Sequence, residues 1–210
     1  MSSDIRTDPV VWVVDDDEAM RSSLKWLIES VGMRVESFSS ADAFLGGHYP
    51  GRFGCLLLDV RMPGMSGLEL LDHLKHEQML PPTIVITGHG DVPMAVRAMK
   101  AGATDFIEKP FNDEVLLDSI RRALMAEKER RITGSQAAEI AERMAHLTPR
   151  EHEVMLMVTE GKSNKEIANG LGVSAKTIEA HRARVMEKMQ AGSLAELVRM
   201  VIAVEHRTGR

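Results

Sequence analysis

The segment VVWVVDDD, residues 10–17, decides how the first half of this chain folds. Five apolar residues followed at once by acidic ones are typical of a strand that is buried on both faces of a parallel sheet. An apolar run followed by a polar side chain recurs three times. The runs and their polar residues are Cys55–Leu58 with Asp59, Thr83–Ile86 with Thr87, and Thr104–Ile107 with Lys109.

Helical patterns separate these runs. Apolar residues recur every three or four positions, as on one face of a helix, in Ala19–Val31, Gly67–His76, Val92–Ala101 and Asp113–Leu124. A further short strand is expected at Arg34–Phe38. The alternation of strand and helix predicts a parallel sheet with helices on both faces. Ligands bind beyond the carboxyl ends of such strands, so the polar residues should meet in one crevice.

The polar residues of that crevice suit phosphoryl chemistry. Asp15, Asp16 and Asp59 form a like-charged cluster that is costly unless a cation neutralises it. Hard oxygen ligands with room for water favour Mg²⁺. Asp59 could then attack phosphorus as a nucleophile. Lys109 would neutralise the transferring oxygens, and the Thr87 hydroxyl would donate a hydrogen bond to one of them.

A plain structural role is open to several of these residues. Asp15, Asp16 and Asp17 could serve only to cap the first helix, and Lys109 could be a surface lysine. We assign capping to Asp17 alone, because chance would otherwise have to place a suitable polar residue at four separate strand ends.

Four segments resemble the receiver domain of two-component response regulators. They are Val13–Asp17, Leu57–Gly67, Ile86–Gly90 and Phe106–Phe111. The resemblance covers residues 10–125 and implies a flavodoxin-like fold, a doubly wound five-stranded parallel sheet in the order 2-1-3-4-5. It implies that Asp59 accepts a phosphoryl group from a sensor histidine kinase.

The same resemblance assigns the other crevice residues. Mg²⁺ would be bound by Asp16, Asp59 and the Arg61 carbonyl, with Asp15 contributing through water. Thr87 would be the switch hydroxyl, Phe106 the switch aromatic residue, and Lys109 the phosphate-contacting lysine. A cis peptide bond before Pro110 is also implied.

Residues 1–9 and 126–146 flank the receiver-like region. The first segment is expected to be a flexible N-terminus, and it lacks the apolar core of a signal peptide. The second is expected to be a helical linker that is broken at Thr133–Ser135. Ile140, Met144 and Leu147 share one helical face, and the sequence leaves open whether this face dimerises or docks on either domain.

Residues 147–205 carry repeated helix-start signals. Capping boxes occur at Thr148–Glu151 and at Ser163–Glu166, and further caps are expected at Ser174 and Ser193. A short helix, a turn at Gly172 and a longer helix indicate a helix-turn-helix inside a four-helix domain. Residues 206–210 form a tail.

The third of these helices has an inward and an outward face. In a major groove, Lys176 could donate to guanine, Glu179 could accept from cytosine, and Ala180 could touch a thymine methyl group. The flanking Arg182 and Arg184 are better placed for phosphates, together with Lys162, Asn164 and Lys165 at the entry of the preceding helix. The set expected at DNA is Lys162, Asn164, Lys165, Lys176, Thr177, Glu179, Ala180, Arg182, Ala183 and Arg184. A small helical bundle with an ordinary charged face is the alternative.

Three segments look like the LuxR-type DNA-binding domain, namely Leu147–Glu151, Glu160–Ala168 and Val173–Arg182. Joined to a receiver, it resembles the NarL/FixJ class of response regulators, and its FixJ branch in particular. This implies a protein that dimerises when phosphorylated, binds double-stranded promoter DNA and acts with RNA polymerase, more often to activate than to repress. No enzymatic activity is implied beyond accepting and hydrolysing its own phosphoryl group.

Composition agrees with a two-domain protein of the cytoplasm. The 210 residues include a single cysteine, Cys55, and no apolar run near the roughly 20 residues that span a bilayer. Residues 1–130 carry 14 Lys and Arg against 21 Asp and Glu, a net charge of −7, and residues 131–210 have a net charge of +2. Only the second part suits a polyanion. A metal-dependent phosphohydrolase and a phosphorylation-dependent protein adaptor are the competing hypotheses.

Overall fold

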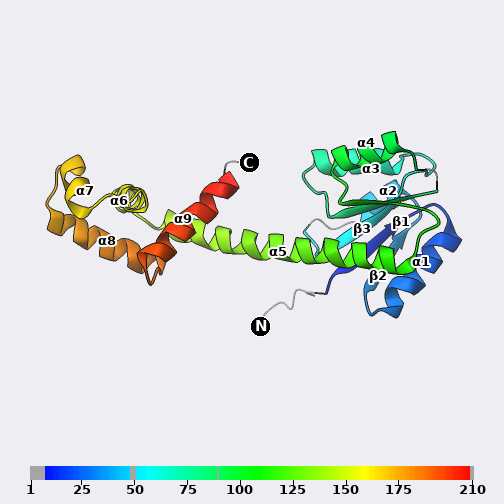
Figure 1. The fold of residues 1–210 in the computed structure, drawn as a ribbon, viewed down its shortest axis with the longest axis horizontal. Helices are drawn as coiled ribbons and strands as arrows, with labels where there is room; N and C mark the ends of the chain where they lie inside the picture. The colour runs from blue at the N-terminus through cyan, green and yellow to red at the C-terminus, as the bar shows by residue number, and fades with distance from the viewer. Residues whose placement is uncertain (1–7, 48–50, 89, 209–210) are drawn as a thin grey trace. The chain divides into compact units, whose positions relative to one another are not determined.

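The structure is a computed structural model that describes residues 8–47, 51–88 and 90–208 (Figure 1). It divides into two compact units, residues 1–130 and 131–210. Most of the N-terminus that we expect to be flexible, residues 1–7, lies outside the described residues, as do His89 and residues 209–210.

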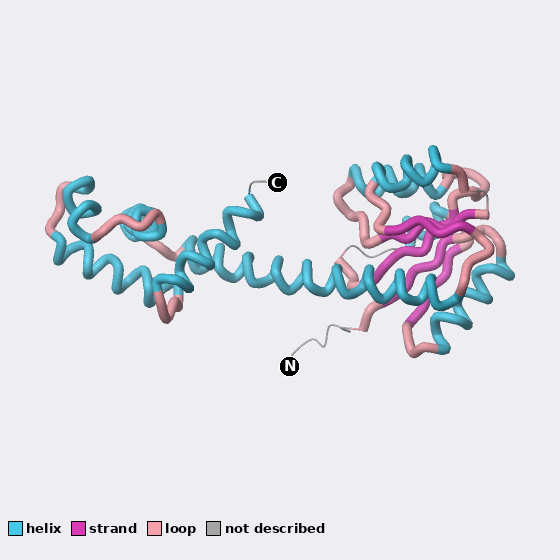
Figure 2. Tube along the Cα trace, viewed as in Figure 1, coloured by secondary structure: helices cyan, strands magenta, loops and turns pink. Residues whose placement is uncertain are grey.

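The first unit contains a five-stranded parallel sheet in the order β2-β1-β3-β4-β5, as the resemblance to receiver domains implies. Figure 2 shows its strands in magenta. The strands are β1 Val10–Val14, β2 Arg34–Phe38, β3 Gly54–Asp59, β4 Thr83–Thr87 and β5 Asp105–Glu108. Their bounds differ from the predicted ones by one residue at most. The central strands β1, β3 and β4 are buried along their whole length, which explains their nearly unbroken apolar sequences.

Helices cover both faces of this sheet. They are α1 Glu18–Ser30, α2 Ala41–Gly47, α3 Gly67–His76, α4 Val92–Ala101 and the first part of α5 Asp113–Ala145. The helix α2 is absent from the elements that the sequence pattern predicts. This helix has only seven residues, too few for an apolar period to show, and its Phe44 is held by edge contacts with the rings of Trp12 and Phe38.

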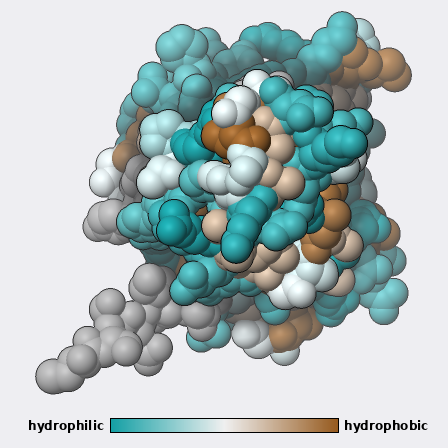
Figure 3. Space-filling view, turned by 90° about the vertical axis from the view of Figure 1, so that its left-hand side faces the viewer, coloured by the Kyte–Doolittle hydropathy of each residue, from teal (hydrophilic) through white to brown (hydrophobic). Residues whose placement is uncertain are grey.

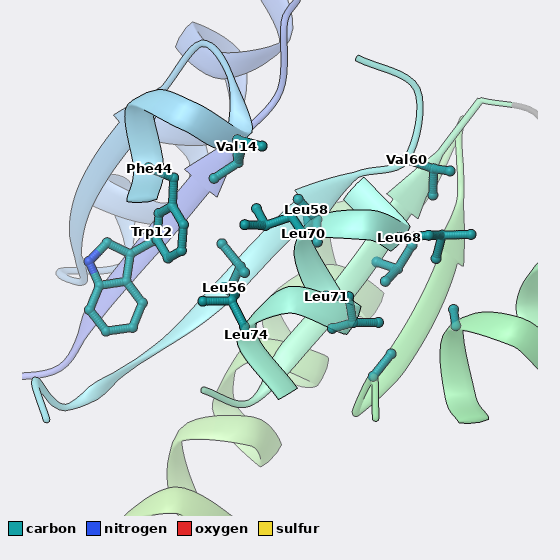
Figure 4. Packing of buried hydrophobic residues seen from close by; sticks show 14 of the residues in the cluster. Trp12, Val14, Phe44, Leu56, Leu58, Val60, Leu68, Leu70, Leu71 and Leu74 are labelled. Atoms are coloured by element: carbon teal, nitrogen blue, oxygen red, sulfur yellow. The ribbon is translucent and has the colours of Figure 1, made fainter. Parts of the chain in front are cut away.

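Alternate residues of the strands feed two separate cores. Trp12, Leu56 and Leu58 point to the face covered by α2, α3 and α4 (Figure 4). On the opposite face, Val11 and Leu57 pack with residues of α1 and α5. This division follows from the period of two along a strand. The two cores hold β1 and β3 between them as paired neighbours, so the polar residues at the carboxyl ends of these strands lie close together.

The helix α5 is longer than predicted. The predicted break at Thr133–Ser135 is wrong, since α5 continues through Gly134 without interruption to Ala145. A single glycine inside a helix costs only about 1 kcal/mol. Beyond it, Ala137 is buried, and Ile140 and Met144 pack against the core of the second unit.

The second unit contains the helices α6 Pro149–Thr159, α7 Asn164–Leu171, α8 Ala175–Met189 and α9 Leu194–Thr208. Both predicted capping boxes form, and Ser174 caps α8. Gly172 ends α7 in the left-handed conformation, the geometry that a tight turn between two helices requires. The predicted helix-turn-helix is therefore present as α7 and α8.

Within the described part of the chain, no helix combines the length and the apolar composition needed to cross a bilayer.

Candidate functional site

A lysine and two aspartates meet at the carboxyl edge of the sheet. Lys109 Nζ lies 2.8 Å from Asp15 Oδ2 and 2.8 Å from Asp59 Oδ1. The two aspartates are only 3% and 8% exposed. The three residues come from the ends of β1, β3 and β5 and are far apart in sequence. The structure thus brings together residues that the sequence analysis placed in one crevice.

Backbone groups hold the two aspartates in place. The Arg61 amide donates to Asp59 Oδ2 at 2.7 Å, and the Asp17 amide donates to Asp15 Oδ1 at 2.9 Å. Thr87 is 1% exposed, and its carbonyl accepts a 2.8 Å hydrogen bond from the Lys109 amide. The ladder between β4 and β5 therefore fixes Thr87 beside the lysine.

Burial and charge oppose each other in this cluster. Burial raises the pKa of the Asp59 carboxyl, and hydrogen bonds from Lys109 and the Arg61 amide offset part of that rise. Burial would also lower the pKa of Lys109, but its bonds to Asp15 and Asp59 outweigh burial and raise that pKa. Lys109 therefore stays positively charged and can face a further anion.

The donor set suits a hard divalent cation. Asp15, Asp16 and Asp59 contribute three carboxylates against the single ammonium of Lys109, which leaves a formal charge of −2. Asp16 is exposed and the other two carboxylates are buried. Among the described residues, no three His, Cys, Asp or Glu side chains are already arranged around one metal position. Oxygen donors with residual negative charge are nevertheless the ligands that Mg²⁺ prefers.

Three further predictions concern the neighbouring loops. Asp17 caps α1, as predicted, because its carboxylate accepts hydrogen bonds from the amides of Ala19 and Met20. The bond between Lys109 and Pro110 is cis. Phe106 is half-buried, and its ring packs so closely on Gly90 that a Cβ there would lie 3.1 Å from the ring.

Sequence reasoning missed two residues that shape the crevice. Arg21 Nη1 donates to the Asp15 carbonyl at 2.8 Å and so braces the turn after β1. Gly67 begins α3 against the backbone of Asp59, and a Cβ at this position would lie 2.0 Å from the Asp59 carbonyl oxygen. Gly67 stands within a segment that resembles the receiver domain, but no local pattern reveals either contact.

The second unit exposes most of the residues expected at DNA. The end of this unit around α7 and α8 is mainly hydrophilic (Figure 3). Asn164 and Arg182 are half-buried, and the Arg182 guanidinium donates a hydrogen bond to the Asn164 side-chain oxygen. The exposed members are Lys162, Lys165, Lys176, Thr177, Glu179, Ala180, Ala183 and Arg184.

The inward face of α8 packs on the core of the second unit, as predicted. Ile178 and Val185 are buried, and His181 is half-buried between them on the same face. The buried face and the exposed face of α8 are therefore those that the helical period indicates. The DNA contacts of individual side chains stay a prediction.

A buried carboxylate, that of Glu151, lies in the first turn of α6. Glu151 Oε2 accepts hydrogen bonds from Lys188 Nζ at 2.6 Å and from the Thr148 amide at 2.9 Å. The Lys188 ammonium, followed by the Thr148 amide, lowers the pKa of Glu151 to about 2. This carboxylate joins the α6 capping box to the last turn of α8.

We expect the second unit to lose stability as the pH falls from about 4.5 to about 2. The pKa of Glu151 is lower in the folded state than its ordinary value of 4.5, so its stabilisation is fully present above pH 4.5 and is lost toward pH 2. Glu151→Gln should cost about 1–3 kcal/mol at neutral pH and flatten the pH dependence in this window. Thermal unfolding of both chains between pH 7 and pH 2 checks this, and parallel curves would contradict it.

Two family models match the chain. The response regulator receiver domain matches residues 11–121, and the luxR family of bacterial regulatory proteins matches residues 145–201. The transcriptional regulatory protein FixJ of Bradyrhizobium diazoefficiens is 49% identical over 91% of this chain and 94% of its own length. Nodulation protein W of the same organism is 45% identical over 92% of this chain and 86% of its own length.

Two solved structures are also similar to most of the chain. The response regulator StyR has a TM-score of 0.82 and 44% identity, covering 92% of this chain and 98% of StyR. Full-length FixJ from B. japonicum has a TM-score of 0.57 and 47% identity, covering 94% of this chain and 98% of FixJ.

Proposed function

The chain belongs to the response-regulator family, in the class that joins a receiver domain to a LuxR-type DNA-binding domain, and we propose that Asp59 is its phosphoacceptor. Membership of this family implies a sensor kinase as partner and DNA as target. One observation supports phosphoryl chemistry at Asp59. Lys109, at the end of the last strand, lies 2.8 Å from both Asp59 and Asp15, so a cation already stands beside the nucleophile.

The chemistry that we propose is transfer from a phosphohistidine of the kinase. A carboxylate oxygen of Asp59 forms a bond to phosphorus, the phosphorus–nitrogen bond breaks, and the imidazole leaves. Lys109 neutralises the transferring oxygens, and the Thr87 hydroxyl donates to one of them. Bound Mg²⁺ would supply further positive charge, held by Asp16, Asp59 and the Arg61 carbonyl with Asp15 acting through water.

Phosphorylation would act as a switch between two pre-existing states. Thr87 moves toward the phosphoryl group, and the half-buried Phe106 ring moves with it, which changes the surface of α4, β5 and α5. The phosphorylated state has to be favoured by a few kcal/mol for the change to matter. The result is release or dimerisation of the DNA-binding domain.

The proposed output is control of transcription in the cytoplasm. The exposed face of α8 enters the major groove, where Lys176, Glu179 and Ala180 can reach base edges. Lys162, Lys165 and Arg184 are placed for phosphates. A homodimer would bind two half-sites of a promoter and act on RNA polymerase. We propose that it activates transcription.

A selection from random duplex DNA tests this output. The full chain would be incubated with the pool, with and without Mg²⁺ and beryllium fluoride as a phosphoryl mimic. We expect enrichment of a motif with two half-sites, and stronger enrichment with the mimic. Enrichment of no sequence in either state would contradict DNA recognition and favour the protein-adaptor hypothesis.

A further inference from the structure

The last turns of α5 hold the C-terminal end of α8. Arg143 Nη1 donates to the Met189 carbonyl at 3.3 Å, and in the reverse direction Lys188 Nζ donates to the His146 carbonyl at 3.2 Å. Met189 is the last residue of α8, so its carbonyl has no partner within the helix. A guanidinium at this end of a helix also faces the negative pole of its dipole. Arg143 therefore supplies a hydrogen-bond partner to a carbonyl that has none inside α8.

The same turns are packed into the helical domain. Leu147 is part of the buried core of the second unit, and Ile140 and Met144 pack against that core. Residues 140–147 therefore belong structurally to the DNA-binding unit. The apolar face that the sequence left unassigned is used here for docking on this domain.

The position of this contact matters because of the length of α8. Lys176, at the other end of the helix, precedes Lys188 by 12 residues, or about 18 Å of helix. A tilt of about 10° about the C-terminal end of α8 would move its N-terminal end, which carries Lys176, by about 3 Å. Such a shift is large for a hydrogen bond to a base edge, which tolerates only tenths of an ångström.

We propose that Arg143 is a positioning residue for DNA recognition, and that it sets the angle of α8 through the Met189 carbonyl. This role rests on the proposed function, in which the exposed face of α8 reads bases. Arg143 acts at the end of α8 remote from the predicted base contacts. Its loss should therefore weaken recognition of sequence while sparing contacts to phosphates.

Binding to two duplexes separates these effects. The probes are the duplex selected by the full chain and a scrambled duplex of equal length, each measured at several salt concentrations. Arg143→Met should bind the selected duplex about tenfold more weakly and the scrambled duplex within about twofold of the unchanged chain. The slope of affinity against salt should not change, and Arg143→Lys should restore the preference.

Controls make each outcome decisive. Lys25→Met removes an equal charge from an exposed position on α1 and should bind both duplexes as the unchanged chain does. Equal loss on both duplexes, with a salt slope smaller by about 0.9, would show a phosphate contact and overturn the positioning role. Unchanged binding by Arg143→Met would overturn it as well.

The remaining outcomes are also separable. Were Arg143→Met to unfold at the assay temperature, the same comparison is made at a lower temperature at which this variant is folded, with the same expectation. An unchanged chain that shows no preference between the two duplexes would instead overturn the proposed function, and the role of Arg143 with it.

Discussion

Replacing Asp59 with asparagine is expected to end phosphoryl uptake by this chain. The carboxamide cannot attack phosphorus, so uptake should fall at least about 10³-fold. The fold should survive, because the carboxamide oxygen can still accept a hydrogen bond from Lys109 or from the Arg61 amide. Radiolabelled acetyl phosphate, with Mg²⁺ present, provides the measurement.

Asp17→Asn is the matched control for this change. Asp17 lies beside the cluster in sequence, but its carboxylate caps α1, and asparagine is an equally good cap. We expect this variant to take up label like the unchanged chain. Label that still reaches Asp59→Asn would show that another residue is the acceptor.

The second large effect is expected at Lys109. In Lys109→Met, the buried carboxylates of Asp15 and Asp59 lose their shared cation. Breaking a buried ion pair by removing one partner costs about 3–5 kcal/mol, so the free energy of unfolding of the receiver should fall by about 3 kcal/mol without divalent cations. Added Mg²⁺ should restore part of this loss, and more in the variant than in the unchanged chain.

Tryptophan fluorescence during urea unfolding isolates this effect. The two tryptophans, Trp12 and Trp26, both lie in the receiver unit, and Trp12 is fully buried. The second unit contains no tryptophan, so the signal reports on the receiver alone. Lys25→Met, which alters an exposed lysine, should leave the midpoint nearly unchanged. Equal midpoints for Lys109→Met and the unchanged chain would contradict the structural role of Lys109.

The receiver was predictable because its signals are local. Each central strand is an apolar run with a polar residue at its end, and burial on both faces produces such runs directly. Right-handed connections then force the carboxyl ends to one edge of the sheet. The convergence of Asp15, Asp59 and Lys109 followed from these two rules.

The helical domain was predictable for a different reason. Its helices begin at capping boxes, such as Thr148–Glu151 and Ser163–Glu166, whose residues lie three positions apart. The error at Gly134 shows where local rules end. The helix propensity of one glycine is a weak term, and packing of Ile140 and Met144 on a distant core outweighs it.

The sequence by itself determined the strand ends, the helix starts and the set of charged residues at the crevice, because each depends on neighbours within a few positions. Only the tertiary structure decided that Arg21 braces Asp15, that Gly67 packs on Asp59 and that Arg143 holds the end of α8. Arg21 and Gly67 contact residues only six and eight positions away, but these contacts form only when α1 and α3 pack at the ends of β1 and β3. For Arg143 the physical reason is distance along the chain. A hydrogen bond between residues that are 46 positions apart, as between Arg143 and Met189, leaves no periodic trace in the sequence and exists only once the helices have packed.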